Sequence, residues 1–366
     1  GRVRQAGASQ AEGQTIMDLK ARAEQSLFTF AKFILGRKRL TPHLHGRLSR
    51  RIQKVPPRRK LFLLPMGTFK TTLISQALPM HMHIQAAATN PYWPGLNGSE
   101  MRIMLGCEAQ DLASSRLRWV ASQWETNKLL RAFWPHKCWD RPLAQAKKWN
   151  ETEIILPREI DYHEPSMHAL GVGGAFIGYH YNVLLKDDIV ALKAANSPIV
   201  MDGAYDWHLA SRTRLSPDEE LGLEFTIGTR WAPRDVYERI IEEDPTVEVE
   251  SHALVEDGLP LFPEAFPLDK IATLQKEEGV MFWLWRMNST ANPELVDFDL
   301  SQLRSYELKD NFLLFSEDDR DIDLAKAPKP KAMEDNHAPK VLTRDAWDDL
   351  IQELRADGVG VKARMG

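Results

Sequence analysis

The sequence predicts an α/β protein built on a mostly parallel central sheet that is flanked by helices. Short apolar runs alternate along the chain with segments of helical periodicity, which is the order expected of such a sheet. The run 61–64 is apolar throughout, as in a strand buried on both faces, and a helical pattern follows over 70–85. A second unit has the same order, with a strand at 101–105 and a helix at 111–124.

The remaining elements follow from the same periodicities. Two helices precede the first strand: one runs from about Thr15 to Leu35, and a basic one covers 40–53, opening on Thr41-Pro42. The other expected elements are strands at 153–156, 167–172, 183–185, 223–228 and 247–253, and helices at 199–213, 234–243 and 268–288.

Composition excludes several classes of protein. The chain has 366 residues, of which 43% are hydrophobic and 27% charged, so it is not disordered throughout. Its two cysteines cannot build a disulfide framework or a four-cysteine zinc site, and they favour a reducing compartment. No apolar run reaches the roughly 18 residues that span a bilayer, and the N-terminus lacks the apolar core of a signal peptide, so we expect no membrane partner.

Charge is distributed unevenly along the chain. The net charge is −4, yet no aspartate or glutamate occurs from Gln25 to Ser99, a stretch that contains many lysines and arginines. Such a stretch indicates a polyanionic partner, such as nucleotide phosphate or nucleic acid, or else an ordinary basic surface on a bipolar protein. The run from Arg47 to Lys60 is the candidate DNA-contacting surface, although it could instead flank the nucleotide.

Changes of character along the chain divide it into four parts. Glu307 to Asp323 is acidic, Ala325 to Lys340 is rich in proline and lysine, and Thr343 is placed to cap a last helix. The predicted parts are an N-terminal helical arm (residues 1–36), the main α/β domain (37–306), an acidic and then Pro/Lys-rich linker (307–340) and a C-terminal helix or tail (341–366).

The segment 61–73 has the design of a phosphate-binding loop. A buried strand enters a tight turn with Gly67, and Lys70-Thr71 then opens a helix, so that backbone N–H groups can face an anion. Lys70 would reach the β- and γ-phosphates, and the Thr71 hydroxyl would ligate Mg²⁺. The other reading is a surface Lys-Thr pair at a helix start. The loop residues expected to bind the nucleotide are Pro65, Met66, Gly67, Thr68, Phe69, Lys70, Thr71 and Thr72.

Two adjacent carboxylates end a later strand. Asp187 and Asp188 follow an apolar run, and the carboxyl ends of strands are where open α/β sheets bind ligands. We assign Asp187 to the metal and Asp188 to the attacking water, which it would orient and deprotonate. The alternative is a solvated Asp-Asp turn.

A third motif, 225–231, is another buried strand that ends in small, hydroxyl and cationic residues. If its end lies beside the other two, Thr229 could sense the γ-phosphate, and Arg230 could transmit the signal or touch DNA. A plain strand-to-loop junction with a surface arginine is the competing reading.

In this order and spacing, the three motifs resemble the ATPase domain of the large terminase subunit of tailed bacteriophages, the motor that packages DNA into the procapsid. The resemblance runs from about Leu27 to Tyr306 and includes the helix that begins Leu40-Thr41-Pro42. It also includes the Pro-x-Gly-x-x-Lys-Thr-Thr loop, the strand ending Lys-Asp-Asp and the Gly-Thr-Arg-Trp motif.

The resemblance implies a P-loop NTPase fold of the ASCE type that binds ATP and Mg²⁺. Lys70 and Thr71 match the Walker A lysine and hydroxyl, Asp187 matches the Walker B aspartate, and Asp188 stands where many relatives have the catalytic glutamate. The residues Gly228, Thr229 and Arg230 match the motif that couples hydrolysis to DNA movement, and His45 lies near an adenine-contacting position; a histidine without a ligand is the alternative there.

The same resemblance implies partners and a location. The partners would be double-stranded DNA, further copies of the chain in a homo-oligomeric ring, a portal protein and a small terminase subunit. The location would be the host cell cytoplasm, in a packaging complex that is not part of the mature virion. An arginine would act on the γ-phosphate across the ring interface; Arg158 is our candidate, with Arg116 and Arg118 as competitors and a solvated arginine as the alternative for each.

Three departures from the family pattern keep other functions open. Met66 replaces an arginine found in many relatives, and Phe69 replaces the second loop glycine. After Asn336 too few residues follow for the usual nuclease domain, so we expect the nuclease to be absent from this chain. The alternatives are another P-loop DNA translocase or helicase-like ATPase, and a degenerate P-loop scaffold that does not hydrolyse nucleotide.

Overall fold

The computed structural model describes residues 17–290, except 177, 196 and 216–220, together with three short strands between 306 and 323. The chain divides into two compact units, residues 1–295 and 296–366. Each unit is described by itself.

A seven-stranded sheet forms the centre of the first unit. Its spatial order is β3-β4-β2-β5-β6-β1-β7, and every neighbouring pair is parallel except β3 with β4. The prediction of an α/β fold with a mostly parallel sheet is therefore confirmed. The strands are β1 (Arg59–Leu63), β2 (Ile103–Cys107), β3 (Glu153–Ile154), β4 (Met167–Gly171), β5 (Val183–Asp187), β6 (Leu223–Gly228) and β7 (Glu248–Ser251).

The inner strands are apolar because both faces of the sheet are covered. Alternate side chains point to opposite faces, so Phe62 and Leu105 enter one core while Leu61 and Met104 enter the other. Strand β7, at the edge, is by contrast only partly buried. This arrangement explains why the inner strands read as continuous apolar runs in the sequence.

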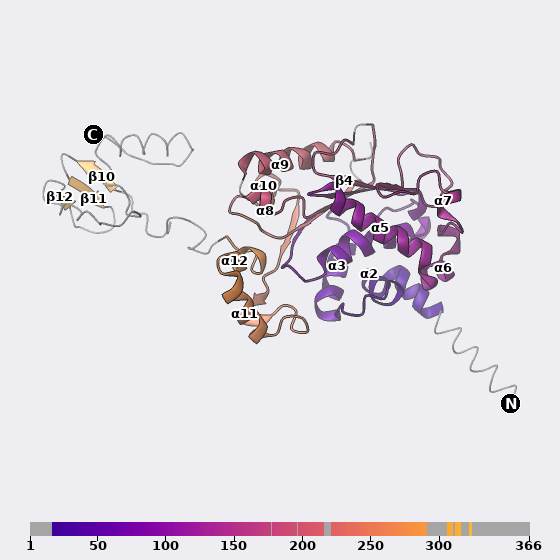
Figure 1. Cartoon of the computed structure of the whole chain (residues 1–366), viewed down its shortest axis with the longest axis horizontal. Helices are drawn as coiled ribbons and strands as arrows, with labels where there is room; N and C mark the ends of the chain where they lie inside the picture. Colours follow the sequence, from indigo (N-terminus) through magenta and orange to yellow (C-terminus); the bar gives the residue numbers. More distant parts are fainter. Residues whose placement is uncertain are drawn as a thin grey trace, which may run out of the picture. The chain divides into compact units, whose positions relative to one another are not determined.

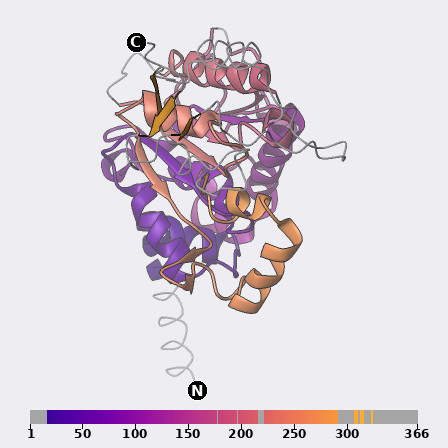
Figure 2. The same ribbon diagram turned by 90° about the vertical axis from the view of Figure 1, so that its left-hand side faces the viewer.

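Helices cover the two faces unequally (Figure 1). The larger core contains residues of α2 (Leu27–Thr29), α3 (Arg47–Gln53), α4 (Leu78–His83), α5 (Gln110–Thr126) and α6 (Lys128–Phe133), and of the π-helical turns η1 (Phe30–Ile34), η2 (Pro42–Gly46) and η3 (Thr72–Ala77). The smaller core contains residues of α8 (Leu192–Ala195), α9 (Pro198–Arg212) and α10 (Val236–Glu243). Figure 2 shows α9, in pink, across the top of the molecule and the indigo N-terminal helices below.

The short connecting elements lie outside these layers. They are the 3₁₀ turns η4 (Ala87–Thr89), η5 (Gly98–Glu100) and η6 (Pro135–Lys137), the helical turn α7 (Pro142–Gln145), and the two-stranded ribbon of β8 (Val255–Glu256) with β9 (Leu259–Pro260). No described helix is long and apolar enough to cross a membrane.

The predicted N-terminal arm is part of the main core. Residues 17–25 are helical, and Leu27, Phe30 and Ile34 are almost completely buried in the larger cluster. Residues 1–16 lie outside the described residues. The boundary predicted after residue 36 therefore does not separate two structural units.

The helix predicted over 268–288 is two helices. α11 (Leu268–Glu278) ends at Gly279, whose φ of 54° is in the left-handed region, and α12 (Met281–Trp285) follows. A glycine adopts this conformation without the penalty that a side chain would add. The break redirects the chain, and periodicity alone does not show it.

The segment predicted as a linker contains a small antiparallel sheet. Its order is β10 (Tyr306–Lys309), β11 (Phe312–Phe315) and β12 (Ile322–Asp323). The interpretation of residues 307–340 as plain linker is therefore wrong for the acidic part, whose apolar runs pair as strands. The predicted C-terminal helix at 341–366 lies outside the described residues.

Gly106 sets how closely α9 approaches the sheet. A Cβ atom added at Gly106 would lie 2.4 Å from the ring of Trp207, whereas one added at Gly203, on α9, would meet nothing within 4 Å. We expect Gly106→Ala to lower the free energy of unfolding by about 1–3 kcal/mol through overpacking. Gly203→Ala should instead raise it by up to about 1 kcal/mol through helix propensity. Urea unfolding of the two variants checks this, and equal stabilities would contradict the packing role of Gly106.

Candidate phosphate and metal site

The loop between β1 and the next helix makes a tight turn. Gly67 has a φ of 84° and Phe69 a φ of 58°, and the Thr68 hydroxyl donates to the Pro65 carbonyl at 2.7 Å. Helical residues then continue without interruption from Lys70 to His83. The first N–H groups of a helix have no partner within it, so this end of the helix can receive an anion.

Lys70 points from this helix start toward the ends of two other strands. Its buried ammonium lies 3.3 Å from Asp188 Oδ1, after β5, and contacts the Thr229 hydroxyl, after β6. Thr229 in turn donates to the Leu64 carbonyl at 3.1 Å. The three segments that the sequence singled out therefore meet around one lysine.

Asp187 is completely buried beside this lysine. The Thr71 hydroxyl donates to its Oδ1 at 3.1 Å, and Arg116 Nε, from α5, lies 2.6 Å from its Oδ2. Burial raises the pKa of Asp187 and the neighbouring charge of Asp188 raises it further, while Arg116 and Lys70 act in the opposite direction. The net direction is upward, so the site stabilises the ionised carboxylate incompletely without a further cation.

Two of these groups could hold Mg²⁺. The Thr71 hydroxyl and Asp187 Oδ1 are 3.1 Å apart, close to the ~3 Å that separates adjacent oxygen ligands of an octahedral magnesium ion with bonds of about 2.1 Å. The described residues contain no cluster of three histidine, cysteine or carboxylate side chains able to hold a metal alone. Mg²⁺ commonly takes only one or two carboxylates and completes its shell with phosphates and water, so the residues present fit this ion.

Strand order explains why these residues meet. Strand β6 lies between β1 and β5, with Leu63 opposite Gly228 and Asp187 opposite Ile227. The carboxyl ends of parallel strands share one edge of the sheet, so the loop after β1, the acids after β5 and Thr229 after β6 are neighbours. Ligands bind at this edge in open α/β sheets.

Arg230 faces the interior rather than solvent. It is buried, its Nε donates to Asp235 at 3.0 Å, and its Nη2 donates to Glu238 at 2.6 Å. Asp235 also caps α10 by accepting from two of its N–H groups. Arg230 thus joins the end of β6 to α10 and, in this conformation, does not present its charge to DNA.

Gly228 lies directly under an aromatic ring. A Cβ atom added there would be 2.1 Å from the Tyr237 ring, so this motif position requires glycine. Tyr237, on α10, is completely buried. The Gly228–Arg230 motif is consequently packed tightly against α10.

His45 braces the phosphate loop and has no free nitrogen for a base. Its Nδ1 accepts from the Thr41 N–H at 2.9 Å, which leaves Nε2 protonated to donate to the Thr68 carbonyl at 3.1 Å. Burial lowers the pKa of His45 to about 4, so the ring is neutral at pH 7. Both ring nitrogens of His45 therefore have partners inside the protein, and its expected contact with adenine stays a prediction.

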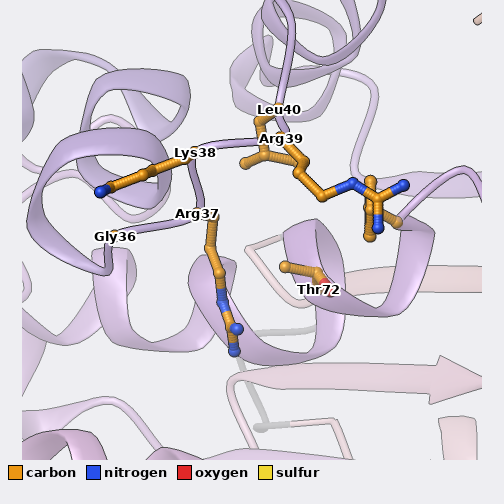
Figure 3. A pocket seen from close by; sticks show the side chains of 7 residues that line it. Gly36, Arg37, Lys38, Arg39, Leu40 and Thr72 are labelled. Atoms are coloured by element: carbon orange, nitrogen blue, oxygen red, sulfur yellow. The ribbon is translucent and has the colours of Figure 1, made fainter. Parts of the chain in front are cut away.

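The side chain of Phe69 packs in a cluster of aromatic rings, which restricts the turn at a position where the resembled family has glycine. Its ring centroid lies 5.9 Å from the rings of both His45 and Phe262, and the Arg39 guanidinium lies 4.9 Å above it. A cavity of about 250 Å³ opens beside it, next to the phosphate loop (Figure 3). The residues that line it are Gly36, Arg37, Lys38, Arg39, Leu40, Phe69 and Thr72.

The three candidate trans-acting arginines have different surroundings. Arg158 Nη2 donates to the carbonyls of Tyr162 and Glu164 at 2.7 and 2.9 Å, within its own loop. Arg118 pairs with exposed Glu151 at 3.5 Å. Arg116 instead reaches Asp187 of the same chain. Its role in the site was missed, because seventy-one residues separate the pair and no local pattern links them.

Two cations of the predicted DNA-contacting stretch have partners inside the chain. Arg51 pairs with Glu248 and Glu250 at 2.9 Å each, and Lys60 is buried against the carbonyls that end α3. Burial lowers the pKa of Lys60 to about 8. Arg51 and Lys60 therefore use their charges inside the chain, and DNA contact by the stretch from Arg47 to Lys60 stays a prediction.

Comparison with known proteins gives a distant likeness of fold to solved structures. No family model matches the chain, and no curated protein matches its sequence. A solved structure of the large terminase ATPase domain of a Thermus phage, determined for an arginine-to-alanine mutant, matches with a TM-score of 0.40 and 12% identity. The match covers 68% of this chain and 93% of that one. A likeness this distant carries no information about activity.

The neutral state of His45 should make stability depend on pH. Its folded-state pKa of about 4 lies below the ordinary 6.5, so its contribution is present above pH 6.5 and is lost as the pH falls toward 4. We expect His45→Gln to lose less stability between pH 7 and pH 4.5 than the unaltered chain does, by about 2 kcal/mol. Urea unfolding at both pH values measures this, and an identical difference for the two proteins would contradict it.

Arg116 should be far more important for stability than its neighbour on the same helix. Removing one partner of a buried ion pair leaves an uncompensated charge and costs about 3–5 kcal/mol. We therefore expect Arg116→Ala to lower the free energy of unfolding by about that amount, and Arg118→Ala, at an exposed pair, to change it by less than about 1 kcal/mol. Similar unfolding midpoints for both variants would show that Asp187 does not depend on Arg116.

Proposed function

We propose that this chain is the Mg²⁺-dependent ATPase part of a terminase large subunit, a motor that moves double-stranded DNA into a procapsid. The observation that carries this proposal is the convergence of Lys70, Thr71, Asp187 and Asp188 at one sheet edge. Thr71 and Asp187 are 116 positions apart in sequence yet hydrogen-bonded. A surface Lys-Thr pair and a solvated Asp-Asp turn would have no reason to meet there.

The phosphates of ATP would bind at the turn and the helix start. The unpaired N–H groups of the first helical turn favour an anion, and Lys70 supplies a positive charge beside them. Asp188 and Thr229 contact the Lys70 ammonium. The cavity beside Phe69 and Thr72 would take the base and ribose, with Arg39 and Arg37 at its wall.

Thr71 and Asp187 would hold Mg²⁺. When bound, this ion neutralises charge that develops on the transferring phosphoryl group. Arg116 lies on the other carboxylate oxygen of Asp187, so it leaves Oδ1 and the Thr71 hydroxyl for the metal. Arg116 then keeps the buried carboxylate oriented and ionised.

Asp188 would orient the attacking water and accept its proton. Its φ of 50° turns its side chain out of the strand direction and toward Lys70. Its backbone is held on both sides, because its N–H donates to Ile227 and its carbonyl accepts from Glu108. This contact with Lys70 supports the proposal that Asp188 would lie near a water in line with the γ-phosphate.

The partners follow from the proposed activity. DNA contact would involve mainly phosphates, with little sequence preference and a steep dependence on salt. Copies of the chain would form a ring, docked to a portal protein and served by a small terminase subunit in the host cytoplasm. Arg158 would act across the ring interface only after releasing its carbonyl partners, Tyr162 and Glu164.

Two other functions compete with this one. A helicase-like ATPase would use the same loop and carboxylates but would separate strands. A scaffold that does not hydrolyse nucleotide is favoured by Phe69, whose left-handed backbone and aromatic packing make the loop less adaptable than a glycine would. DNA-dependent turnover separates the motor from the scaffold, and strand separation identifies the helicase.

The test is steady-state ATP hydrolysis by the full chain, with Mg²⁺, in the presence and absence of double-stranded DNA. We expect turnover that DNA stimulates, and we expect Lys70→Ala to reduce it by about 10²–10³-fold because a charge-stabilising group is lost. Lys276→Ala, which removes an exposed lysine from α11, is the matched control and should behave like the unaltered chain.

Each outcome of this experiment has a definite meaning. Hydrolysis that Lys70→Ala leaves unchanged would exclude the loop as the nucleotide site. ATP binding without turnover, measured by calorimetry, would favour the scaffold. Turnover that is indifferent to DNA would favour an ATPase that is not a DNA motor.

A further inference from the structure

The phosphate loop is held at Met66 by the end of α12. The Met66 N–H donates to the Trp285 carbonyl at 3.1 Å, and Arg286 Nη1 donates to the Met66 carbonyl at 2.7 Å. The N–H and the carbonyl of Met66 are therefore bound by two consecutive residues, Trp285 and Arg286. Arg286 is 220 positions from Met66 in the sequence.

Glu278 holds the arginine in place. Its two carboxylate oxygens accept from Arg286 Nε and Nη2 at 2.5–3.1 Å, and both side chains are largely buried. The reversal at Gly279 brings the end of α11 and the end of α12 together for this contact. A planar guanidinium can serve a carboxylate and a carbonyl at once, which a lysine ammonium cannot do in the same geometry.

The loop needs such external support. Gly67 and Phe69 both have positive φ, and for a residue with a side chain this conformation persists only where its surroundings impose it. The ring of Phe266 packs against Gly67, since a Cβ atom added to Gly67 would lie 2.7 Å from that ring. Phe266 also lies 5.6 Å from the Arg286 guanidinium.

We propose that Arg286 is a positioning residue of the phosphate site: held by Glu278, it keeps the Met66–Gly67 peptide in the orientation that directs the Gly67 N–H away from Arg286 and leaves it for phosphate. A carbonyl that rotated into the loop would repel the anion, and the bond to Arg286 prevents that rotation. The inference rests on the proposed function in taking phosphate as the ligand. The loop has Met66 where many members of the resembled family have an arginine, and Arg286 brings a guanidinium to this residue from a distant segment.

The two possible roles of Arg286, attracting phosphate by its charge or positioning the loop, predict opposite effects of removing Glu278. If Arg286 attracted phosphate by its charge, removing the neutralising Glu278 would strengthen ATP binding. If Arg286 positions the loop, removing Glu278 frees the guanidinium to leave Met66 and weakens binding. Glu277, the exposed neighbour on the same helix, provides the matched control.

The experiment measures ATP affinity, KM and kcat, with Mg²⁺, for the full chain carrying Arg286→Ala, Arg286→Lys, Glu278→Ala or Glu277→Ala. We expect the first three variants to raise the Kd and KM for ATP about tenfold or more, with a smaller change in kcat, and Glu277→Ala to match the unaltered chain. The absence of rescue by lysine separates positioning from charge. ATP binding by Glu278→Ala that is equal to or tighter than that of the unaltered chain overturns the proposal.

Hydrogen exchange without nucleotide keeps this test independent of the proposed function. Arg286→Ala and Arg286→Lys should speed exchange of the Met66 amide at least tenfold, while the strand amides of β1 stay protected. Unchanged Met66 exchange refutes the positioning role even if the chain proves not to bind ATP. Faster Met66 exchange in a chain that fails to bind ATP would instead refute the proposed function and the phosphate role together, leaving only a structural clasp.

Discussion

Burial of the Asp187 carboxylate is the constraint around which this site is organised. A carboxylate removed from water is costly unless charges and hydrogen-bond donors replace the water, and here Thr71 and Arg116 each cover one oxygen. Those two residues come from the helix after β1 and from α5, so satisfying one carboxylate ties two helices to the end of β5. Lys186, the residue before it, points to the opposite face and pairs with buried Glu224 at 3.1 Å. Burial raises the pKa of Glu224, but Lys186 and the neighbouring cations outweigh it and hold that pKa below its usual value.

The position of β6 in the sheet brings Lys70, Asp188 and Thr229 together beside Asp187. Because β6 separates β1 from β5, Lys70 must cross its end to reach Asp188, and Thr229 stands there to receive the ammonium. Arg230, one residue on, is locked to α10 through Asp235. Contacts therefore run from Lys70 to Thr229 and, through the neighbouring Arg230, to α10.

The sequence predicted the sheet well because each inner strand is buried on both faces and reads as an unbroken apolar run. It also placed Lys70 after one buried strand and Asp187 and Asp188 at the end of another, and these residues meet because parallel strands share one edge. It could not find Arg116 or Arg286, because each acts through a contact between distant segments that leaves no periodic trace. A resemblance located His45 near the loop, but only the structure could show that both of its ring nitrogens have partners inside the protein. The break at Gly279 was missed because a helical pattern continues on either side of it.

The long basic stretch without a carboxylate has a similar explanation. The basic stretch contains no acids, but the edge strand β7 and the residues before it supply them. Glu248 and Glu250 pair with Arg51, and Asp244 lies 4.0 Å from Arg59. Lys60 offsets the carbonyl end of α3, a use of a cation that needs no carboxylate at all. Part of the positive charge of this stretch is therefore bound by acids and carbonyls of the folded chain. A cation that is already paired in this way attracts a polyanion less strongly. Among the described residues, Arg37 and Arg39, which line the cavity beside the loop, contact the rings of Trp119 and Phe69 instead of a carboxylate.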